Sequence, residues 1–200
     1  MALTAWEQGL FLTLLALITL AQLGALLGLV RKRGASDQGS ALALVSSWWA
    51  VLAVSAIEAW RFPGLLAEPR WLPYLGAIAF FLGLAIRVIA VNTLAKQFSP
   101  LVELQEDHAL VTHGLYAWVR HPAYVGSLLW ALSVPLILGS AIGLAAVAVL
   151  YVPALRFRIH VEERLLEGHF GEAFADYQRR VPALFPRPPR RGPASEDQSM

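Results

Sequence analysis

The sequence lacks cysteine and has few charged residues. Of its 200 residues, 57% are hydrophobic and only 15% are charged, whereas soluble globular chains are about 25% charged. Without cysteine the chain has no disulfide framework, thiolate zinc site, iron–sulfur cluster or cysteine nucleophile. A soluble domain of this length leaves much of its surface in water and could not hide so much apolar surface. The composition therefore indicates an integral membrane protein.

Several site patterns are missing as well. The sequence contains no Walker loop, no Gly-x-Gly-x-x-Gly fingerprint and no His-Glu-x-x-His. None of the five histidines is four residues from another, so no helix presents two imidazoles on one face and we predict no metal site. His113 and His169 are expected to make ordinary interfacial hydrogen bonds. The net charge of +2 gives no reason to expect a nucleic-acid partner.

Long uncharged runs are present instead. Residues 9–30 can cross a hydrocarbon core of about 30 Å. Their positive charges follow the run rather than precede it, which favours an uncleaved span over a signal peptide. Residues 41–57, closed by Glu58, Trp60 and Arg61 at an interface, predict a second span, and residues 72–91 predict a third.

The uncharged stretch 123–155 is too long for a single crossing. Gly139-Ser140 near its middle predicts a tight hairpin of two helices, 123–139 and 140–157. The expected fold class is an all-α integral membrane protein with about five transmembrane helices, a C-terminal helical hairpin and a cytoplasmic helical extension.

The distribution of lysine and arginine predicts the orientation. Cytoplasmic placement of the 31–40 loop, the 92–122 segment and the tail from 156 puts thirteen of the 16 basic residues inside. The N-terminus is then outside and the C-terminus cytoplasmic, in a membrane that we expect to be a bacterial inner membrane. All five histidines are in the cytoplasmic segments. Arg87 lies within the third span, where snorkelling, a structural ion pair and a functional role remain open.

The first informative polar segment is 108–126. Gly114 permits a turn, and Pro122 biases His121 away from helical geometry while suiting the first turn of a helix. We therefore expect His121 on a loop and Tyr124 in the first turn of the fourth span, whose N-terminus favours an anionic group. An aromatic belt with a positive-inside arginine would explain Trp118 and Arg120, but not the His-Pro pair.

The second informative segment is 156–186. Apolar residues recur at helical spacing up to Phe170, so we expect the fifth helix to continue into the cytoplasm. Arg158 and Glu162 are four apart and share one face of this helix. They form either a surface ion pair or a cation and a carboxylate held together at the membrane face.

The two segments together resemble the isoprenylcysteine carboxyl methyltransferase family. The resemblance covers about residues 85–186 and rests on motifs in the family's order. These are His108-Ala-Leu-Val111, Gly114-x-Tyr116, Arg120-His121-Pro122-x-Tyr124-x-Gly126, Glu162-Glu163-x-x-Leu166, Phe170-Gly171-x-x-Phe174-x-x-Tyr177 and Val181-Pro182, with Arg87-x-x-Ala90 upstream. The resemblance divides the chain into N-terminal transmembrane helices (1–84), a methyltransferase core (85–186) and a tail (187–200) whose composition predicts disorder.

The resemblance implies an S-adenosylmethionine-dependent membrane methyltransferase, with the cofactor on the cytoplasmic side and a lipid-tailed substrate entering from the bilayer. Arg158 would meet the substrate carboxylate as a catalytic residue, and Glu162 would have a catalytic role while also contacting the cofactor. The other implied cofactor-binding residues are His108, Ala109, Leu110, Val111, Tyr116, His121, Pro122, Ala123 and Tyr124.

Some features depart from the family pattern. Phe174 stands where tyrosine is common, Leu115 where proline is common, and the additional N-terminal helices of the animal enzymes exceed five spans. The substrate therefore stays open: a lipophilic carboxylate such as an isoprenylated cysteine, or a phospholipid amine or thiol. A nicotinamide-dependent membrane reductase and a non-catalytic membrane protein are the remaining alternatives. The sequence does not predict the oligomeric state.

Overall fold

The computed structural model describes residues 38–62, 71–94 and 109–185, with isolated positions between 9 and 24. The predicted first span, 9–30, and the tail 187–200 lie wholly or largely outside these residues and stay predictions. Over the described ranges the chain is helical and has no β-strand. The helices are α2 (Gln38–Arg61), α3 (Leu72–Leu94), α4 (Pro122–Leu138), α5 (Ala141–Ala146), α6 (Val152–Phe170) and α7 (Glu172–Arg180), with a 3-10 helix η2 (Gly114–Ala117) and a π-helical turn η3 (Val147–Tyr151).

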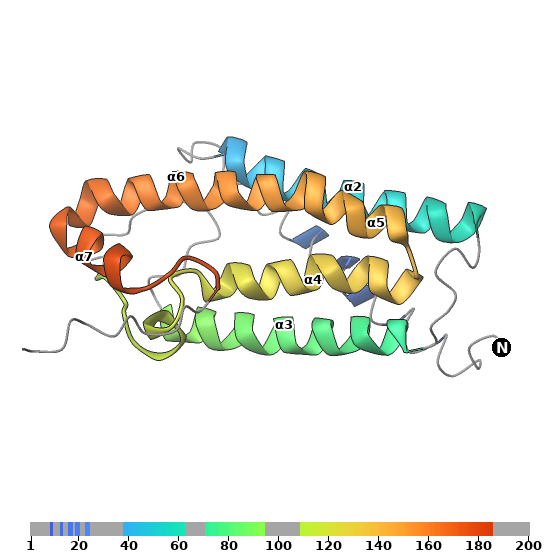
Figure 1. The fold of residues 1–200 in the computed structure, drawn as a ribbon, viewed down its shortest axis with the longest axis horizontal. Helices are drawn as coiled ribbons and strands as arrows, with labels where there is room; N and C mark the ends of the chain where they lie inside the picture. The colour runs from blue at the N-terminus through green and yellow to red at the C-terminus, as the bar shows by residue number, and fades with distance from the viewer. Residues whose placement is uncertain are drawn as a thin grey trace, which may run out of the picture.

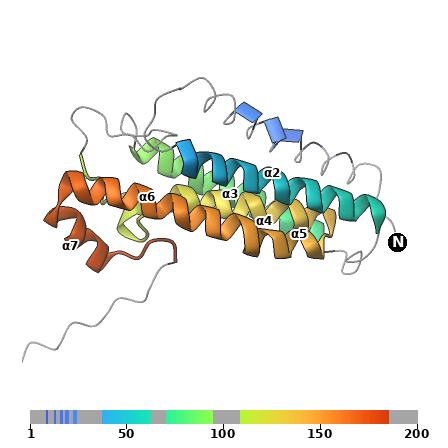
Figure 2. The same ribbon diagram turned by 90° about the horizontal axis from the view of Figure 1, so that it is seen from above.

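The helices form an elongated bundle. α5, η3 and α6 are continuous and form one long helix from residue 141 to residue 170, which lies alongside α2 (Figure 1). α3 and α4 pack together along their length, and α7 folds back beneath the end of α6 (Figure 1, Figure 2). α2, α3 and the helix 141–170 are long and apolar enough to cross a membrane, and α4 is a shorter apolar helix. The predicted all-helical membrane fold is confirmed.

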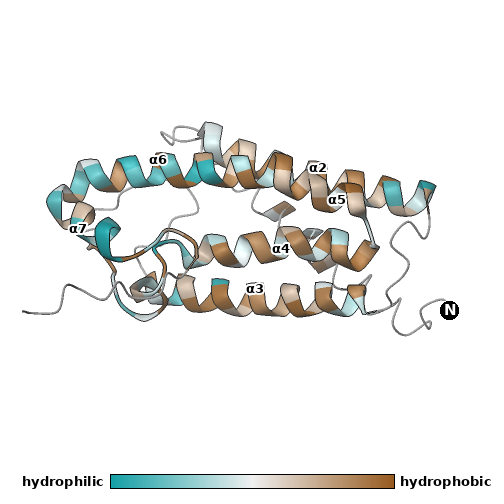
Figure 3. Ribbon diagram, in the orientation of Figure 1, coloured by the Kyte–Doolittle hydropathy of each residue, from teal (hydrophilic) through white to brown (hydrophobic). Residues whose placement is uncertain are grey.

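Hydropathy changes along the bundle. Apolar residues dominate α3, α4 and the α5 end of the long helix, whereas the far end of α6 and α7 are mostly hydrophilic (Figure 3). α6 continues to Phe170 and ends at Gly171, which has a positive φ of 53°. α7 then buries Phe174 and Tyr177. The predicted helical extension beyond the apolar segment is therefore confirmed.

The hairpin turns where the sequence predicts it. Gly139 ends α4 with φ 64° and ψ 37°, a left-handed conformation that glycine adopts without steric cost. Ser140 caps the next helix, because its hydroxyl accepts a hydrogen bond from the Gly143 N–H at 2.8 Å.

The prediction that Glu58 lies at an interface is wrong, because Glu58 is buried. Its side chain is only 3% exposed, and its carboxylate accepts hydrogen bonds from the Ala141 N–H at 3.2 Å, the Ile142 N–H at 2.9 Å and the Ser140 hydroxyl. α2 stays helical through this charged residue to Arg61 because the first turn of α5 supplies the carboxylate with donors that replace water. Trp60 is 77% exposed, as an interfacial residue should be.

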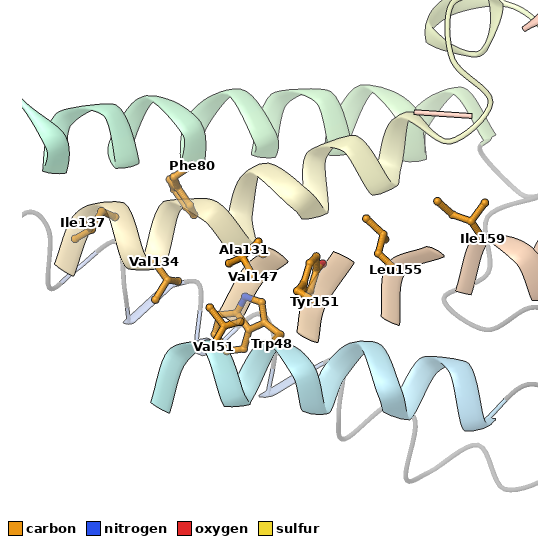
Figure 4. Close-up of a cluster of buried hydrophobic side chains, with 10 residues drawn as sticks. All are labelled: Trp48, Val51, Phe80, Ala131, Val134, Ile137, Val147, Tyr151, Leu155 and Ile159. Carbon is orange, nitrogen blue, oxygen red and sulfur yellow. The ribbon is translucent and has the colours of Figure 1, made fainter. Parts of the chain in front are cut away.

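The buried core joins all the long helices (Figure 4). α2 contributes Trp48 and Val51, and α3 contributes Phe80. The remaining members come from α4 and from the helix 141–170, namely Ala131, Val134, Ile137, Val147, Tyr151, Leu155 and Ile159. The core holds the two helices of the hairpin against α2 and α3, and so fixes the start of α4 relative to α6.

Candidate active site

A polar cluster lies where α4 begins, beside α6 and the start of α2. The chain approaches it through the η2 turn, which Gly114 opens with a positive φ of 63°. His121, with φ −125° and ψ 60°, occupies the N-cap position of α4, and Pro122 occupies the first turn. The predicted placement of His121 outside the helix and Tyr124 in its first turn is confirmed. His121 is 5% exposed, so its imidazole is held inside the cluster.

Tyr124 connects Arg158 with Glu162. Arg158 donates a hydrogen bond from Nε to the Tyr124 hydroxyl at 3.1 Å, and that hydroxyl donates to Glu162 Oε2. Arg158 also donates from Nη1 to the Ser40 hydroxyl at 3.1 Å. The guanidinium is 4% exposed, so it is a buried cation rather than half of a surface ion pair. Charge-assisted hydrogen bonds in such surroundings are strong and fix the positions of their partners.

The buried face of α6 differs from its apolar stripe. Phe157 is one of the apolar residues whose helical spacing predicts this helix, yet it is 50% exposed, whereas Arg158 and Ile159 are buried. An apolar side chain on a helix at a membrane can face outward, because lipid covers it. The interior position is then available to Arg158, whose charge needs the hydrogen bonds that α2 and α4 supply.

Arg120, His121 and Glu163 form a second ionic group beside the first one, which consists of Arg158, Tyr124 and Glu162. Glu163 Oε1 accepts hydrogen bonds from Arg120 at 2.9 Å (Nε) and 2.7 Å (Nη2), and lies 2.9 Å from His121 Nε2. On the other side of the ring, His121 Nδ1 lies 3.8 Å from Glu162 Oε1. His121 therefore stands between the two adjacent carboxylates of α6.

Tyr116 closes the cluster on the η2 side. Its side chain is buried, its hydroxyl donates to the Ala90 carbonyl at 3.4 Å, and its own carbonyl accepts from the Tyr177 hydroxyl at 2.6 Å. Burial is the main cause that raises the pKa of the Tyr116 hydroxyl, so this group stays a neutral donor. η2 is thereby joined to both α3 and α7.

The structure brings most of the predicted site residues together. His121, Pro122, Ala123 and Tyr124 form the start of α4, facing Arg158 and Glu162 on α6 through the contacts given above. Ala109, Leu110 and Val111 lie outside any helix or strand before η2, and no hydrogen bond joins them to another described residue. His108 lies outside the described residues.

Arg87 is directed toward α4. Its Nη1 donates to the Ser127 hydroxyl at 2.9 Å, and its guanidinium lies 5.9 Å from the centroid of the Trp130 ring. Ser127 is one turn along α4 from Tyr124, so Arg87 is near the polar cluster and has partners inside the bundle. These contacts favour a role within the bundle over snorkelling away from it.

Two residues of the polar cluster could not be identified from sequence motifs. Ser40 is fully buried and contacts Arg158 from a position 118 residues earlier in the chain. Gln178 donates from Nε2 to Glu163 Oε2 at 3.4 Å. Neither belongs to a recognisable pattern, and only the packing of α2 and α7 against α6 brings them to the site. Across the residues that the structure describes, no group of three or more histidine or acidic side chains is arranged to hold a metal ion.

Comparison with known proteins finds one family whose pattern covers much of this site. The model of the isoprenylcysteine carboxyl methyltransferase family matches residues 75–168. A protein-S-isoprenylcysteine O-methyltransferase of Tribolium castaneum is 38% identical over 142 residues, which cover 70% of this chain and 49% of that protein. Protein-S-isoprenylcysteine O-methyltransferase B of Arabidopsis thaliana is 35% identical over 127 residues, covering 62% of this chain and 64% of that protein.

A solved structure agrees with these relatives. The structure of the eukaryotic intramembrane Ras methyltransferase, isoprenylcysteine carboxyl methyltransferase, matches with a TM-score of 0.63 at 32% identity, over 88% of this chain and 65% of that one. The chain spans from about half to somewhat under two thirds of the length of these relatives. The resemblance that the sequence motifs indicate is thus confirmed: residues 75–168 carry the pattern of the isoprenylcysteine carboxyl methyltransferase family on that family's fold.

Proposed function

We propose that this protein is a membrane methyltransferase that transfers the methyl group of S-adenosylmethionine to the carboxylate of a lipophilic acceptor such as an isoprenylated cysteine. The observation that carries the proposal is the buried Arg158, linked through Tyr124 to Glu162, in a chain similar to proteins named for this reaction. We further propose that the site faces the cytoplasm, because the basic residues predict that side.

The acceptor would bind at Arg158. A guanidinium offers planar, paired donors that match a carboxylate and keeps its proton throughout. Tyr124 and Ser40 hold this guanidinium from α4 and α2, so its orientation is set before an acceptor arrives. A preset donor group lowers the entropic cost of aligning the acceptor oxygen with the methyl group.

The described residues suit the proposed cofactor. Glu162 is a partly exposed carboxylate beside His121, and it can accept hydrogen bonds from hydroxyl or ammonium groups. Ala109–Val111 precede the η2 turn, whose Tyr116 lies beside the cluster. Residues 109–111, Tyr116, 121–124 and Glu162 would hold the cofactor, together with His108.

Methyl transfer to a carboxylate requires little from the protein beyond holding the acceptor oxygen in line with the methyl group. S-adenosylmethionine supplies a methyl group on a sulfonium, and the acceptor oxygen forms a bond to the methyl carbon as the carbon–sulfur bond breaks. A carboxylate needs no general base. Opposite charges disappear in this reaction, so a site that excludes water favours it. The burial of Arg158 and His121 indicates such a site.

A membrane location suits a lipid-tailed acceptor. Extracting an isoprenyl or acyl tail from the bilayer costs about 0.8 kcal/mol per methylene. An enzyme whose helices lie in the membrane meets that tail without extracting it. The apolar α4 begins at the polar cluster, and the helix 141–170 carries Arg158 and Glu162 beyond its apolar first half. An acceptor whose charged head binds at Arg158 would therefore keep its tail in lipid.

The test is methyl transfer by the purified protein in detergent or nanodiscs. Radiolabelled S-adenosylmethionine is supplied with an isoprenylated cysteine carrying a free carboxylate, and with the same compound as its amide. We expect base-labile label in the first acceptor only, no activity for Arg158→Ala, and activity close to wild type for Arg156→Ala, an exposed arginine of the same helix. Lipid amines and thiols are supplied in parallel, and base-stable label in these with none in the carboxylate would overturn the choice of acceptor. The absence of both cofactor binding and transfer would overturn the proposal.

A further inference from the structure

We infer that Arg120 and Glu163 act as a positioning pair, which holds His121 so that its Nδ1 and Glu162 together receive a hydrogen-bond donor group of the methyl donor. The inference rests on the proposed function and deepens it. It assigns roles to two ionised residues that contact neither Arg158 nor Tyr124 through any hydrogen bond between described residues.

Glu163 is directed toward the back of His121. Its Oε1 is shared by Arg120 Nε at 2.9 Å, Arg120 Nη2 at 2.7 Å and His121 Nε2 at 2.9 Å, and its Oε2 faces Gln178. The side chains of Arg120 and Glu163 are 11% and 18% exposed. A two-donor contact to one oxygen with so little solvent is well ordered, unlike a surface ion pair.

This contact determines which ring nitrogen of His121 can accept a hydrogen bond. An ionised carboxylate can only accept hydrogen bonds, so the proton of the neutral ring lies on Nε2. Nδ1 is then an acceptor, and it faces Glu162 Oε1, another acceptor, at 3.8 Å. Two acceptors cannot hydrogen-bond to each other, but an ammonium group beside both can donate to each, and a hydroxyl can donate to one of them. The geometry therefore points to a donor group of the ligand at this position.

Arg120 ties the pair to the segment after α7. Its Nη1 donates to the carbonyls of Gln178, at 3.2 Å, and Val181. The backbone N–H groups of Arg120 and His121 donate to the carbonyls of Pro182 at 2.9 Å and Ala183 at 3.0 Å. We call residues 181–183 the strap. The strap lies beyond the family match, which ends at residue 168.

The strap, Arg120 and Glu163 have separate structural roles. The strap fixes the backbone of the loop, Arg120 orients Glu163, and Glu163 orients His121. Removing the Glu163 carboxylate leaves the strap bonds in place but releases the ring. A binding defect without global unfolding is the result expected of a positioning residue.

The experiment measures S-adenosylmethionine affinity by calorimetry on the full-length protein in detergent, together with acceptor KM and kcat. For Glu163→Ala we expect affinity to fall about ten- to hundredfold, the effect of losing a hydrogen bond to a charged group, with acceptor KM little changed. Glu163→Gln keeps an acceptor oxygen for His121 Nε2 and should recover most of the affinity. Glu172→Ala, which removes an exposed carboxylate on α7, is the matched control and should bind as wild type does.

A second measurement reports on the ring itself. Nitrogen-15 NMR of labelled histidine distinguishes the two neutral tautomers, and the His121 signal should be protonated on Nε2 in wild type and in Glu163→Gln but mixed in Glu163→Ala. Wild-type protein that fails to bind S-adenosylmethionine would contradict the proposed function itself. Wild-type binding that Glu163→Ala retains in full would overturn the positioning role alone. Should Glu163→Ala not fold, a loss of affinity in Glu163→Gln with the Nε2 tautomer unchanged would overturn it as well.

Discussion

Tyr124 and Arg158 are hydrogen-bonded at 3.1 Å, from hydroxyl oxygen to Nε, across the two arms of the helical hairpin. The same hydroxyl donates to Glu162, one turn further along α6. A single phenol oxygen thus joins the cation proposed to bind the acceptor to the carboxylate proposed to bind the cofactor. The two proposed ligands would therefore meet at Tyr124.

The substitution Tyr124→Phe tests this connection. It keeps the ring but removes both hydrogen bonds, so Arg158 and Glu162 lose their common partner. We expect kcat/KM for methyl transfer to fall about ten- to hundredfold, and the melting temperature to change far less. Trp118→Phe is the control, since Trp118 is 71% exposed. Equal kcat/KM for Tyr124→Phe and wild type would show that the hydroxyl has no part in the reaction.

The contact between α3 and α4 depends on glycine. A Cβ added to Gly83 would lie 2.7 Å from the Gly126 carbonyl oxygen and 2.9 Å from Trp130 Cδ1. Because the first obstacle is backbone, the helices would have to separate, and overpacking of this kind costs about 1–3 kcal/mol. We therefore expect Gly83→Ala to lower the melting temperature in detergent.

Gly168 provides the comparison for that experiment. A Cβ added there meets nothing within 4 Å, and alanine is the better helix former by about 1 kcal/mol. Gly168→Ala should leave the melting temperature unchanged or raise it. A Gly83→Ala variant as stable as Gly168→Ala would contradict the close approach of α3 and α4.

Much of the fold could be predicted because membrane length is a strong physical limit. The uncharged run 123–155 exceeds one crossing, and the break at Gly139-Ser140 follows from a glycine that can adopt a left-handed turn. The position of His121 outside α4 follows from the proline after it. Glu58 could not be placed this way, because its burial depends on donors from Ser140 and the two residues after it.

The site was predictable only where its residues are close in sequence. Arg158 and Glu162 share a helix face by spacing, and residues 121–124 are consecutive. Arg158 meets Ser40, and Arg120 meets the strap, because separate helices pack against each other. Spacing along the chain carries no information about such contacts. The exposure of Phe157 shows a related limit: near lipid, an apolar stripe does not identify the buried face of a helix.

Tyr177 predicts how stability depends on pH. Burial raises the pKa of Tyr177 from 10.0 to about 12, so the folded state keeps a proton that the unfolded state loses above about pH 10. The stabilising contribution is complete below pH 10 and is lost as the pH rises toward 12. Melting temperatures measured from pH 8 to 11.5 should fall more steeply above pH 10 in wild type than in Tyr177→Phe. Parallel curves would contradict this contribution.

Glu58 should stabilise the hairpin without affecting the chemistry. Glu58→Ala leaves the first turn of α5 without acceptors for two backbone N–H groups, and each buried unsatisfied group costs about 1–3 kcal/mol. We expect a large drop in melting temperature for Glu58→Ala and a smaller one for Glu58→Gln, whose amide oxygen still accepts.

Glu58 lies near the C-terminal end of α2, whereas Ser40 contacts the site from the beginning of that helix. At a temperature where both variants are folded, kcat/KM should therefore match wild type. Full thermal stability of Glu58→Ala would show that the carboxylate does not cap the helix. Lost activity in a folded variant would show that the two ends of the bundle are coupled.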